Sequence, residues 1–572
     1  LIVSNTGDTR VMAPVPVLDR YNKAYLSFVR ASVAPDPGGK EGTLKWSDIS
    51  AGRGFKPGHY KIIDVVFKTL KEGTAPNTTN TMTVPELVDE HGDPVAGGSS
   101  SAYLNVGAEK VLGSTDWFVA EGSTGGGFDT WILLQNPQKA DANVEVVFTT
   151  HEGPRQPEKV VVPGKTRYTM RIQDFVPDDF HVSTIVKSDV PIVVERSMYW
   201  DKRFWGASGV AGVPQPYEMK AGHANGGTPM DSVALARPDT RKTMYFPEGS
   251  TASGFDTWIL LCNPGNADAH ARLSLMTPSG AADGGTVLVP ALSRQTVHLN
   301  DLLPNVDQVS VRVASDQPIV AERSMYWDPN AEALEPYEMK GGHASPGSYD
   351  TSREWFIAEG STAEGFETYV LVQNPGDASA RVTATFMTAK GVAAEKTVKM
   401  LPGSRSTFRV SEYVDGDYHV ATKVTADRPV VAERSMYWDK RVTSSVPLMS
   451  EGHSATGCTA CGSKWMVPEG STGGGFDYWV LVSNPKETDT EATVTFMTAS
   501  GPRKPFKIKI PATARYTLRV SDYVPDDFHV STLVETEGKI VVERAMYWDK
   551  RVRAGIQPYE MMGGHSTTGV DP

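Results

Sequence analysis

The chain has 572 residues, which at roughly 150 residues per domain corresponds to about four domains and excludes a single small scaffold. Its 56 Lys and Arg residues stand against 68 Asp and Glu residues, a formal charge of -12 with no run of like charge, so nucleic acid is not expected as a partner. No stretch approaches the ~18 consecutive apolar residues of a membrane span, and we expect none in this chain.

Residues 1–113 form the first predicted unit. The runs AYLSFVRASVA and HYKIIDVVFKTL are typical of β-strands, and segments rich in Gly, Pro, Asn and Thr separate them. This part of the chain lacks the phrase that recurs further on. We therefore predict a divergent N-terminal β-sandwich over residues 1–113.

One pattern then returns four times. The opening phrase reads WFVAEGSTGGGFDTWILLQNP from Trp117, and close variants begin at Tyr245, Trp355 and Trp465. A closing phrase, VVERSMYWD or a near copy, follows in each case, and a glycine-histidine element ends the copy. The closing glutamates, which recur every roughly 110 to 130 residues, are Glu195, Glu322, Glu433 and Glu543. The histidines of the last element are His223, His343, His453 and His565.

A period near 110 residues suits one immunoglobulin-like sandwich and exceeds the ~35 to 50 residues of a propeller blade or helical hairpin repeat. Seven strand-like segments occur in the first copy, at 116–120, 130–135, 143–149, 159–162, 167–172, 181–187 and 192–200. The best helical candidate is a single turn around 172–179. The predicted class is all-β, a tandem and elongated array of immunoglobulin- or fibronectin-like β-sandwiches joined by short Gly/Ser/Pro linkers. The predicted repeats are 114–230, 231–348, 349–458 and 459–572.

Three cysteines are too few for a disulfide-stapled scaffold. Cys458 and Cys461 form a lone C-x-x-C, and neither a second pair nor two well-spaced histidines follow it. We expect either a local disulfide or an inert thiol pair there, and no metal or cofactor.

The combination of EGST, a Gly-Phe-acid-Thr-aromatic strand, an Asn-Pro turn, ERSMYW and a terminal GGH resembles tandem repeat modules of secreted and cell-surface proteins of actinobacteria and related bacteria. The resemblance covers about 450 residues. It implies a β-sandwich fold and an extracellular location at the cell surface, and it brings no catalytic residues. A first residue Leu1 instead of Met is typical of a chain numbered after a signal segment.

The recurring charges predict a structural network. Strand alternation places Glu195 and Arg196 on opposite faces, so they cannot pair with each other, and a half-buried charge needs a partner. Basic residues recur on the earlier strand RYTMR and its equivalents. We predict the pairs Glu195 with Arg171, Glu322 with His298, Glu433 with Arg409 and Glu543 with Arg519. The recurring acids and bases balance in each copy, which favours a paired network over a calcium or zinc cage.

The glycine-histidine elements predict an inter-repeat junction. His223, His343 and His453 each precede, by a short linker, the EGST glutamate of the next copy. Those glutamates are Glu248, Glu359 and Glu469. Each histidine could bridge to the neighbour or pack on its own sandwich, the glycines then serving as chain reversals. If they bridge, His565 has no downstream copy, and the C-terminal segment is free to engage another molecule and propagate a filament.

A catalytic interpretation would use Glu121 with His223, or Glu195 with Glu121 as the carboxylate pair of a glycoside hydrolase. Four near-identical active sites on one chain of sandwiches are unusual, and we expect no enzyme activity. One aromatic recurs on the second strand of each copy and is expected in the core or at a junction more than as a sugar platform. These residues are Trp131, Trp258, Tyr369 and Trp479.

Two functions stay open. In the first, the chain is a non-catalytic extracellular structural protein that assembles with itself, head to tail or side to side, into a surface filament, sheath or surface layer. The alternative is an array of modules that bind a cell-wall glycan or another surface polymer and belong to a larger secreted protein. The first is preferred because these residues include no domain of another type for an array to serve.

Overall fold

The computed structural model describes residues 114–150, 152–200, 221–229, 242–327, 341–438, 451–548 and 563–569, together with the backbone strands of residues 1–104. The chain divides into two compact units, Leu1–Val111 and Leu112–Pro572. In the first unit, three small antiparallel sheets contain the strands β1 (Ile2–Asn5) with β5 (Gly58–Lys61), β3 (Leu26–Ala31) with β6 (Val65–Thr69), and β4 (Leu44–Lys45), β2 (Val17–Leu18), β7 (Asn80–Thr83) and β8 (Ala102–Leu104). How this unit packs lies outside the described residues, so the N-terminal sandwich stays a prediction.

Each repeat of the second unit is built from two antiparallel sheets, and repeat 3, in which each sheet has four strands, gives the pattern. Its strands are β26 (Ser352–Ile357), β27 (Phe366–Asn374), β28 (Ala380–Thr388), β29 (Gly391–Met400), β30 (Ser404–Arg409), β31 (Ala421–Trp438) and β32 (Glu451–Thr456). The first sheet has the order β29-β28-β31-β26, and the second has the order β30-β27-β31-β32. The 18-residue β31 belongs to both sheets, because its two halves pair with different neighbours.

The other repeats follow the same plan. Repeat 1 contains β9 (Ser114–Val119), β10 (Phe128–Gln135), β11 (Ala142–Thr150), β12 (Gly153–Pro154), β13 (Glu158–Val162), β14 (Arg167–Arg171), β15 (Ser183–Trp200), β16 (Ala221–Gly226) and β17 (Thr228–Pro229). Repeat 2 contains β18 (Thr243–Phe246), β19 (Phe255–Asn263), β20 (Ala269–Thr277), β21 (Gly280–Val289), β22 (Ser293–His298), β23 (Ser310–Ser315), β24 (Val320–Trp327) and β25 (Gly341–Pro346). Repeat 4 contains β33 (Gly462–Val467), β34 (Phe476–Asn484), β35 (Thr490–Thr498), β36 (Gly501–Pro502), β37 (Phe506–Ile510), β38 (Ala514–Arg519), β39 (Ser531–Trp548) and β40 (Gly563–Thr568).

Helices in the described ranges are single turns. They are η1 (Ile172–Asp174), α2 (Leu299–Leu302), η5 (Val410–Glu412) and η6 (Val520–Asp522). The predictions of an all-β class, of tandem sandwiches and of one turn at 172–179 are therefore confirmed. The segments predicted at 181–187 and 192–200 are one strand, β15, and the glycine-histidine element is a further strand. No helix among the described residues has the length and apolarity that crossing a membrane requires.

The core of each repeat lies between its two sheets. In repeat 3 it joins Trp355, Phe386 and Val424 of the first sheet to Val370 and Phe408 of the second. Alternation on β28 buries one face and exposes the other, as expected for a sheet with one covered side. The second half of β31 differs, because all nine of its last residues are buried. A second partner must therefore cover the outer face of the second sheet.

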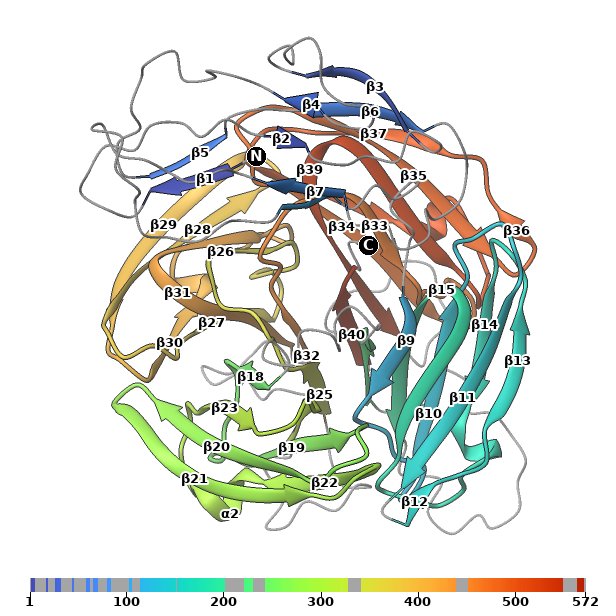
Figure 1. Cartoon of the computed structure of the whole chain (residues 1–572). Helices are drawn as coiled ribbons and strands as arrows, with labels where there is room; N and C mark the ends of the chain where they lie inside the picture. Colours follow the sequence, from blue (N-terminus) through green and yellow to red (C-terminus); the bar gives the residue numbers. More distant parts are fainter. Residues whose placement is uncertain are drawn as a thin grey trace. The chain divides into compact units, whose positions relative to one another are not determined.

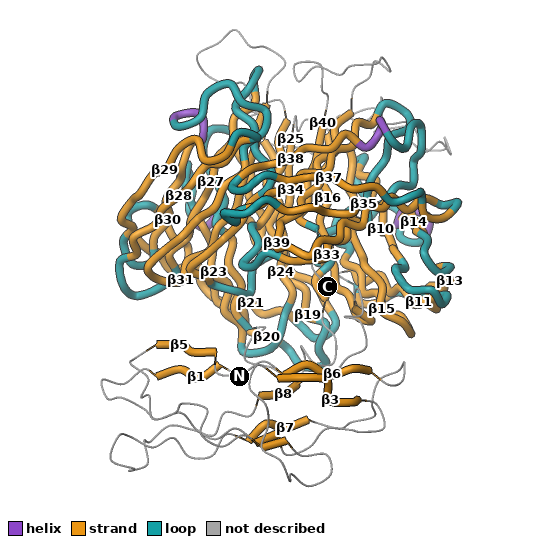
Figure 2. Tube along the Cα trace, turned by 90° about the horizontal axis from the view of Figure 1, so that it is seen from above, coloured by secondary structure: helices purple, strands orange, loops and turns teal. Residues whose placement is uncertain are grey.

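That partner is the next repeat. The four glycine-histidine strands pack in cyclic order, β16 against β25 and β40, and β32 against β25 and β40. Figure 1 shows three of them, β25, β32 and β40, in the middle of the repeats. Figure 2 shows β16, β25 and β40 close together in the middle of the four repeats. The elongated row that the linkers predicted is thus wrong for the repeats, which close into a ring. An open row would leave the buried second face of each end repeat in water, and the ring removes both ends.

Candidate functional site: the junctions between repeats

The junctions are built on the closing strands, where alternate residues face opposite ways. On β24, Glu322 and Tyr326 face one neighbour while Arg323 faces the other. Every residue of this strand is buried. The strand can carry charge at such depth only because both neighbours supply partners.

The arginine of each closing strand pairs with the closing glutamate of the next repeat. The three consecutive junctions contain Arg196–Glu322 at 3.2 Å, Arg323–Glu433 at 3.0 Å and Arg434–Glu543 at 3.3 Å. The fourth pair, Arg544–Glu195, joins the last repeat to the first. The four arginine side chains are 0% exposed. These are charge-assisted pairs with little access to water.

The predicted pairing of the closing glutamates with Arg171, His298, Arg409 and Arg519 is wrong. Strand β10 lies between β14 and β15, and the same order holds in each repeat, so those two strands are not neighbours. The intervening strand carries its own acid, which takes the basic residue. The observed pairs are Arg171–Asp129 at 2.9 Å, Arg409–Glu367 at 2.6 Å, Arg519–Asp477 at 2.8 Å, and His298 with Asp256.

The EGST glutamate completes each junction. In repeat 2, the Glu248 carboxylate accepts a hydrogen bond from the Tyr437 hydroxyl at 2.6 Å and lies 3.4 Å from Arg323. The Glu248 backbone N–H in turn donates to Glu433 at 3.2 Å. Equivalent bonds run from Tyr326 to Glu121 at 2.9 Å and from Tyr199 to Glu469 at 3.1 Å.

The histidine sits between an arginine and a tyrosine. Arg323 donates to Nδ1 of His343 at 3.2 Å, and Nε2 of His343 lies 3.1 Å from the Tyr437 hydroxyl. Because arginine has only donors, Nδ1 must be unprotonated and Nε2 carries the proton. The result is a relay from Arg323 through His343 and Tyr437 to Glu248. The same histidine-to-tyrosine contact recurs in His223–Tyr326 at 3.5 Å, His453–Tyr547 at 3.2 Å and His565–Tyr199 at 3.1 Å.

Burial sets the protonation of these groups. It lowers the pKa of His343 to about 3, with Glu248 opposing, and the pKa values of His223 and His565 are also about 3. Burial likewise raises the pKa of Glu433, which Arg323 only partly offsets. For Glu248, burial is outweighed by His343 and Arg323, and its pKa lies below the usual value. At neutral pH, Glu121, Glu248 and Glu469 are thus ionised, and each lies beside a neutral histidine.

Both of the interpretations left open for the histidines hold at once. His343 lies on β25, which pairs with β24 of its own repeat, and it bonds to Tyr437 of the next. The EGST glutamate near His343 belongs to the same repeat: Nε2 of His343 lies 3.6 Å from the Glu248 carboxylate. The predicted partner, Glu359 of the following repeat, is not the one that His343 contacts. His565 reaches Tyr199 of repeat 1. The C-terminal element is therefore seated in its own ring, and the prediction of a free end that engages a second molecule is wrong.

The alternative interpretation placed a chain reversal at the glycine before each histidine, and this part of it is wrong. It lies within a strand, and a Cβ at Gly342 would stand 2.5 Å from Cδ1 of Tyr326. Gly222, Gly452 and Gly564 meet the tyrosine of their own closing strand in the same way. Glycine is needed here for close approach rather than for turning.

A second arginine clamps each junction from the side. Nη1 of Arg405 donates to the carbonyl oxygens of Gly249 at 2.7 Å and Val309 at 2.8 Å, both in repeat 2. Arg294 and Arg515 make the two corresponding bonds to the preceding repeat, and Arg167 makes one, to the carbonyl oxygen of Gly470 in repeat 4. Sequence reasoning missed this role and that of the closing tyrosines, although both recur in all four copies.

The groups considered for catalysis are buried. Glu121 and His223 lie 3.7 Å apart at 4% and 2% side-chain exposure, and Glu195 contacts repeat 4 instead of Glu121. Within the described ranges, no cluster of His, Cys, Asp or Glu has the arrangement of a metal site. Cys458 and Cys461 are thiols rather than a disulfide, and burial raises the pKa of Cys461 to about 11.

One protein-family model, whose description states no function, matches two segments of the chain. The family model described as "Family of unknown function (DUF5719)" matches residues 210–322 and 343–445. No curated protein matches the chain.

Among solved structures, the chain is similar to Thermotoga maritima 1070 (16% identity, 21% of this chain and 96% of that one, TM-score 0.17). It is also similar to the Anabaena sensory rhodopsin transducer (26% identity, 15% and 89%, TM-score 0.14). A tetra-tandem repeat from the extending region of a large adhesion protein shares 11% identity over 76% of this chain and 93% of that one, with a TM-score of 0.09.

Proposed function

We propose that the chain is a non-catalytic structural protein of the cell exterior whose four repeats form one rigid, ring-shaped building block. The observation that carries this proposal is the junction between Arg544 and Glu195, which repeats the contacts of the consecutive junctions and closes the ring. An extracellular setting is supported by the resemblance of the repeated motifs to secreted and cell-surface modules.

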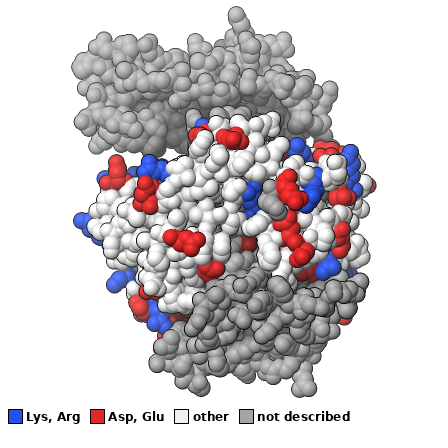
Figure 3. Space-filling model, turned by 90° about the horizontal axis from the view of Figure 1, so that it is seen from below, with Lys and Arg blue, Asp and Glu red and all other residues white. Residues whose placement is uncertain are grey.

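Closure changes how such a block assembles. The described residues of the last strand are occupied by repeat 1, which leaves no support for head-to-tail growth through that strand. Self-assembly into a surface layer or sheath would then run side to side, through the outer faces of the repeats. Acidic and basic side chains are interspersed on the face of the described residues in Figure 3, a pattern that suits contact with another copy more than contact with a polyanion.

The absence of catalysis is proposed from the state of the recurring ionisable groups. Arginine, glutamate and histidine at the junctions are buried and bonded to one another, so their charges are already paired within the protein. Burial of this kind serves to specify which surfaces meet.

Light scattering and negative-stain electron microscopy of the purified chain test the proposal, first in dilute solution and then at high protein concentration. We expect single rings when dilute and lateral arrays of rings when concentrated. Strings of separate beads, or rings that stay single at every concentration, would contradict it.

A further inference from the structure

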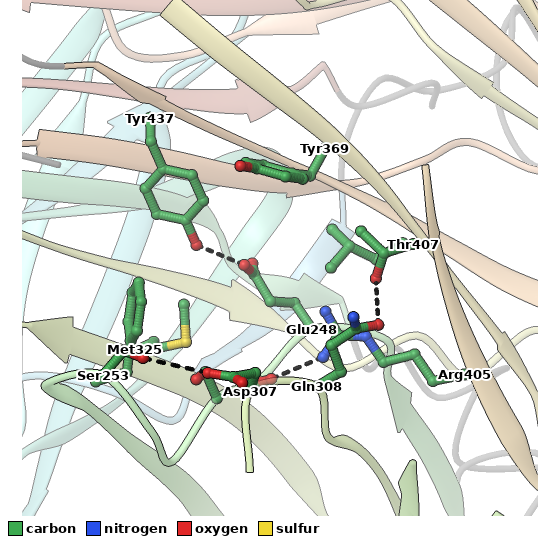
Figure 4. Close-up of a pocket in the computed structure, with 13 residues that line it drawn as sticks. Glu248, Ser253, Asp307, Gln308, Met325, Tyr369, Arg405, Thr407 and Tyr437 are labelled. Carbon is green, nitrogen blue, oxygen red and sulfur yellow. Dashed lines mark hydrogen bonds between the residues drawn. The ribbon is translucent and has the colours of Figure 1, made fainter. Parts of the chain in front are cut away.

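A pocket of about 270 Å³ opens at the junction between repeats 2 and 3 (Figure 4). Repeat 2 contributes Phe255, Asp307 and Gln308 to its wall, and repeat 3 contributes Tyr369 and Thr407. The pocket lies beside the buried relay, since Glu248 and Tyr437 form its floor.

Two substitutions distinguish this junction from the other three. The backbone carbonyls of Val309 and Val182 both accept a hydrogen bond from the clamping arginine of the next repeat, so these two valines are equivalent. Asp307 and Phe180 each lie two residues before them and are therefore equivalent as well. The corresponding residues in repeats 3 and 4 are Tyr418 and Phe528. Tyr369 in turn stands where the other repeats have Trp131, Trp258 and Trp479. Both positions thus carry a smaller side chain at this junction than at the other three.

The wall presents both hydrogen-bond acceptors and donors. Asp307 is exposed, and its carboxylate accepts one bond, from Ser253 at 3.2 Å, which leaves further acceptor sites. The side-chain oxygen of Gln308 accepts from Thr407 at 3.0 Å, so the amide nitrogen of Gln308 is left to donate into the pocket. The Tyr369 hydroxyl has no partner among the described residues. Burial raises the pKa of Tyr369, which keeps this hydroxyl protonated.

Apolar faces and charge complete the description. The rings of Phe255 and Tyr369 are half-buried and line the same space. Arg405, whose pKa is lowered by burial to about 10, is still charged at neutral pH and lies near Glu248. Arg323 is shared between Glu248 and Glu433. The lining therefore has two carboxylates, Glu248 and Asp307, and one guanidinium, and the cationic comparison in the experiment below tests whether this acidic excess selects a cation.

We infer that this pocket binds one neutral saccharide unit of a glycan. A sugar ring offers C–H faces that pack on aromatic rings and hydroxyl groups that both donate and accept, which matches the Asp307, Gln308 and Tyr369 side chains. A volume just below the ~300 Å³ lower bound of drug-sized sites fits a single ring rather than a chain. The inference does not depend on the structural role proposed above, because an empty pocket would leave the ring intact.

Saturation-transfer NMR on the full chain tests the inference. The probes are the methyl glycosides of glucose, galactose, mannose, rhamnose and N-acetylglucosamine, with choline as the cationic comparison. We expect at least one glycoside to bind with a Kd below about 10 mM. The double variant Asp307→Phe/Tyr369→Trp, which introduces the larger side chains found at the equivalent positions of repeats 1 and 4, should weaken that binding at least about tenfold.

The variant Tyr369→Phe keeps the pocket shape, and it should lower the affinity severalfold without changing the melting temperature. It keeps the test decisive if the double variant fails to fold. Phe180→Tyr, at the equivalent position of repeat 1, is the matched control and should bind as the wild type does. The inference is overturned if no glycoside in the panel binds, if choline binds and the glycosides do not, or if both pocket variants bind with wild-type affinity.

Discussion

The junction between repeats 4 and 1 can be compared with that between repeats 2 and 3. The second joins repeats that follow one another in the chain, whereas the first joins Arg544 to Glu195 across 349 positions. The two junctions nevertheless share the arginine–glutamate pair, the histidine–tyrosine contact and the EGST glutamate. Repeat surfaces, rather than chain connectivity, therefore determine which repeats meet.

Deleting residues 563–572 should have the largest effect on this comparison. The deletion removes β40, which pairs with β39, and leaves Arg544 and Tyr199 without their His565 partner. We expect a loss of more than about 5 kcal/mol in the free energy of unfolding, because buried polar groups lose their bonds along with the strand. Urea denaturation followed by tryptophan fluorescence measures it. A truncated chain as stable as the full one would show that β40 is dispensable.

Removing the glutamate from either junction should cost nearly the same. Glu195→Ala and Glu433→Ala each strand a buried arginine, Arg544 or Arg323, for an expected loss of about 3 to 5 kcal/mol. The two variants should differ in hydrodynamic size. Glu195→Ala weakens the junction of repeats 4 and 1, which no linker spans, so the ring of this variant can open and sediment more slowly. Denaturation and sedimentation velocity together check both points. A Glu195→Ala chain with wild-type stability would mean that the closing junction is not formed.

The histidines should make both junctions acid-sensitive. His343 and His565 titrate near 6.5 when unfolded but have pKa values of about 3 when folded, so the unfolded chain binds more protons as the pH falls. Each should lower the stability by up to about 1.4 kcal/mol per pH unit below pH 6.5. Replacing either with Asn should remove that share of the slope between pH 6.5 and 5. The raised pKa of Glu433 acts with the opposite sign, but it is present in both the variant and the wild type. Equal slopes for variant and wild type would indicate a protonated histidine in the fold.

An exposed ion pair provides the smallest expected effect. Lys507 and Glu491 lie 2.6 Å apart on the surface of repeat 4, with both side chains in solvent. Glu491→Gln should leave the denaturation midpoint and the sedimentation coefficient unchanged, because surface pairs contribute little. A shift comparable to that of Glu433→Ala would undermine the distinction between junction and surface charges.

The strands and the repeat unit could be predicted from the sequence, because the alternation of apolar residues and the turn residues are local signals. The closing of the ring was not, since nothing local says which repeat covers the second face of β31. One available signal was overlooked: Glu195 and Arg196 point to opposite faces of a strand whose apolar residues also face both ways. Such a strand needs cover on both sides, and a single sandwich supplies only one. The pocket could not be predicted from the recurring residues, because Asp307 and Tyr369 are positions at which one repeat differs from the other three.

Distances between spin labels test ring closure most directly. Labels at the equivalent exposed positions Leu288 and Lys399 span the junction of repeats 2 and 3, and labels at Val161 and Lys509 span that of repeats 4 and 1. In a background with Cys458 and Cys461 replaced by Ser, double electron–electron resonance should give narrow and closely similar distance distributions for both pairs. A narrow distribution for the first pair with a long, broad one for the second would contradict the closed ring.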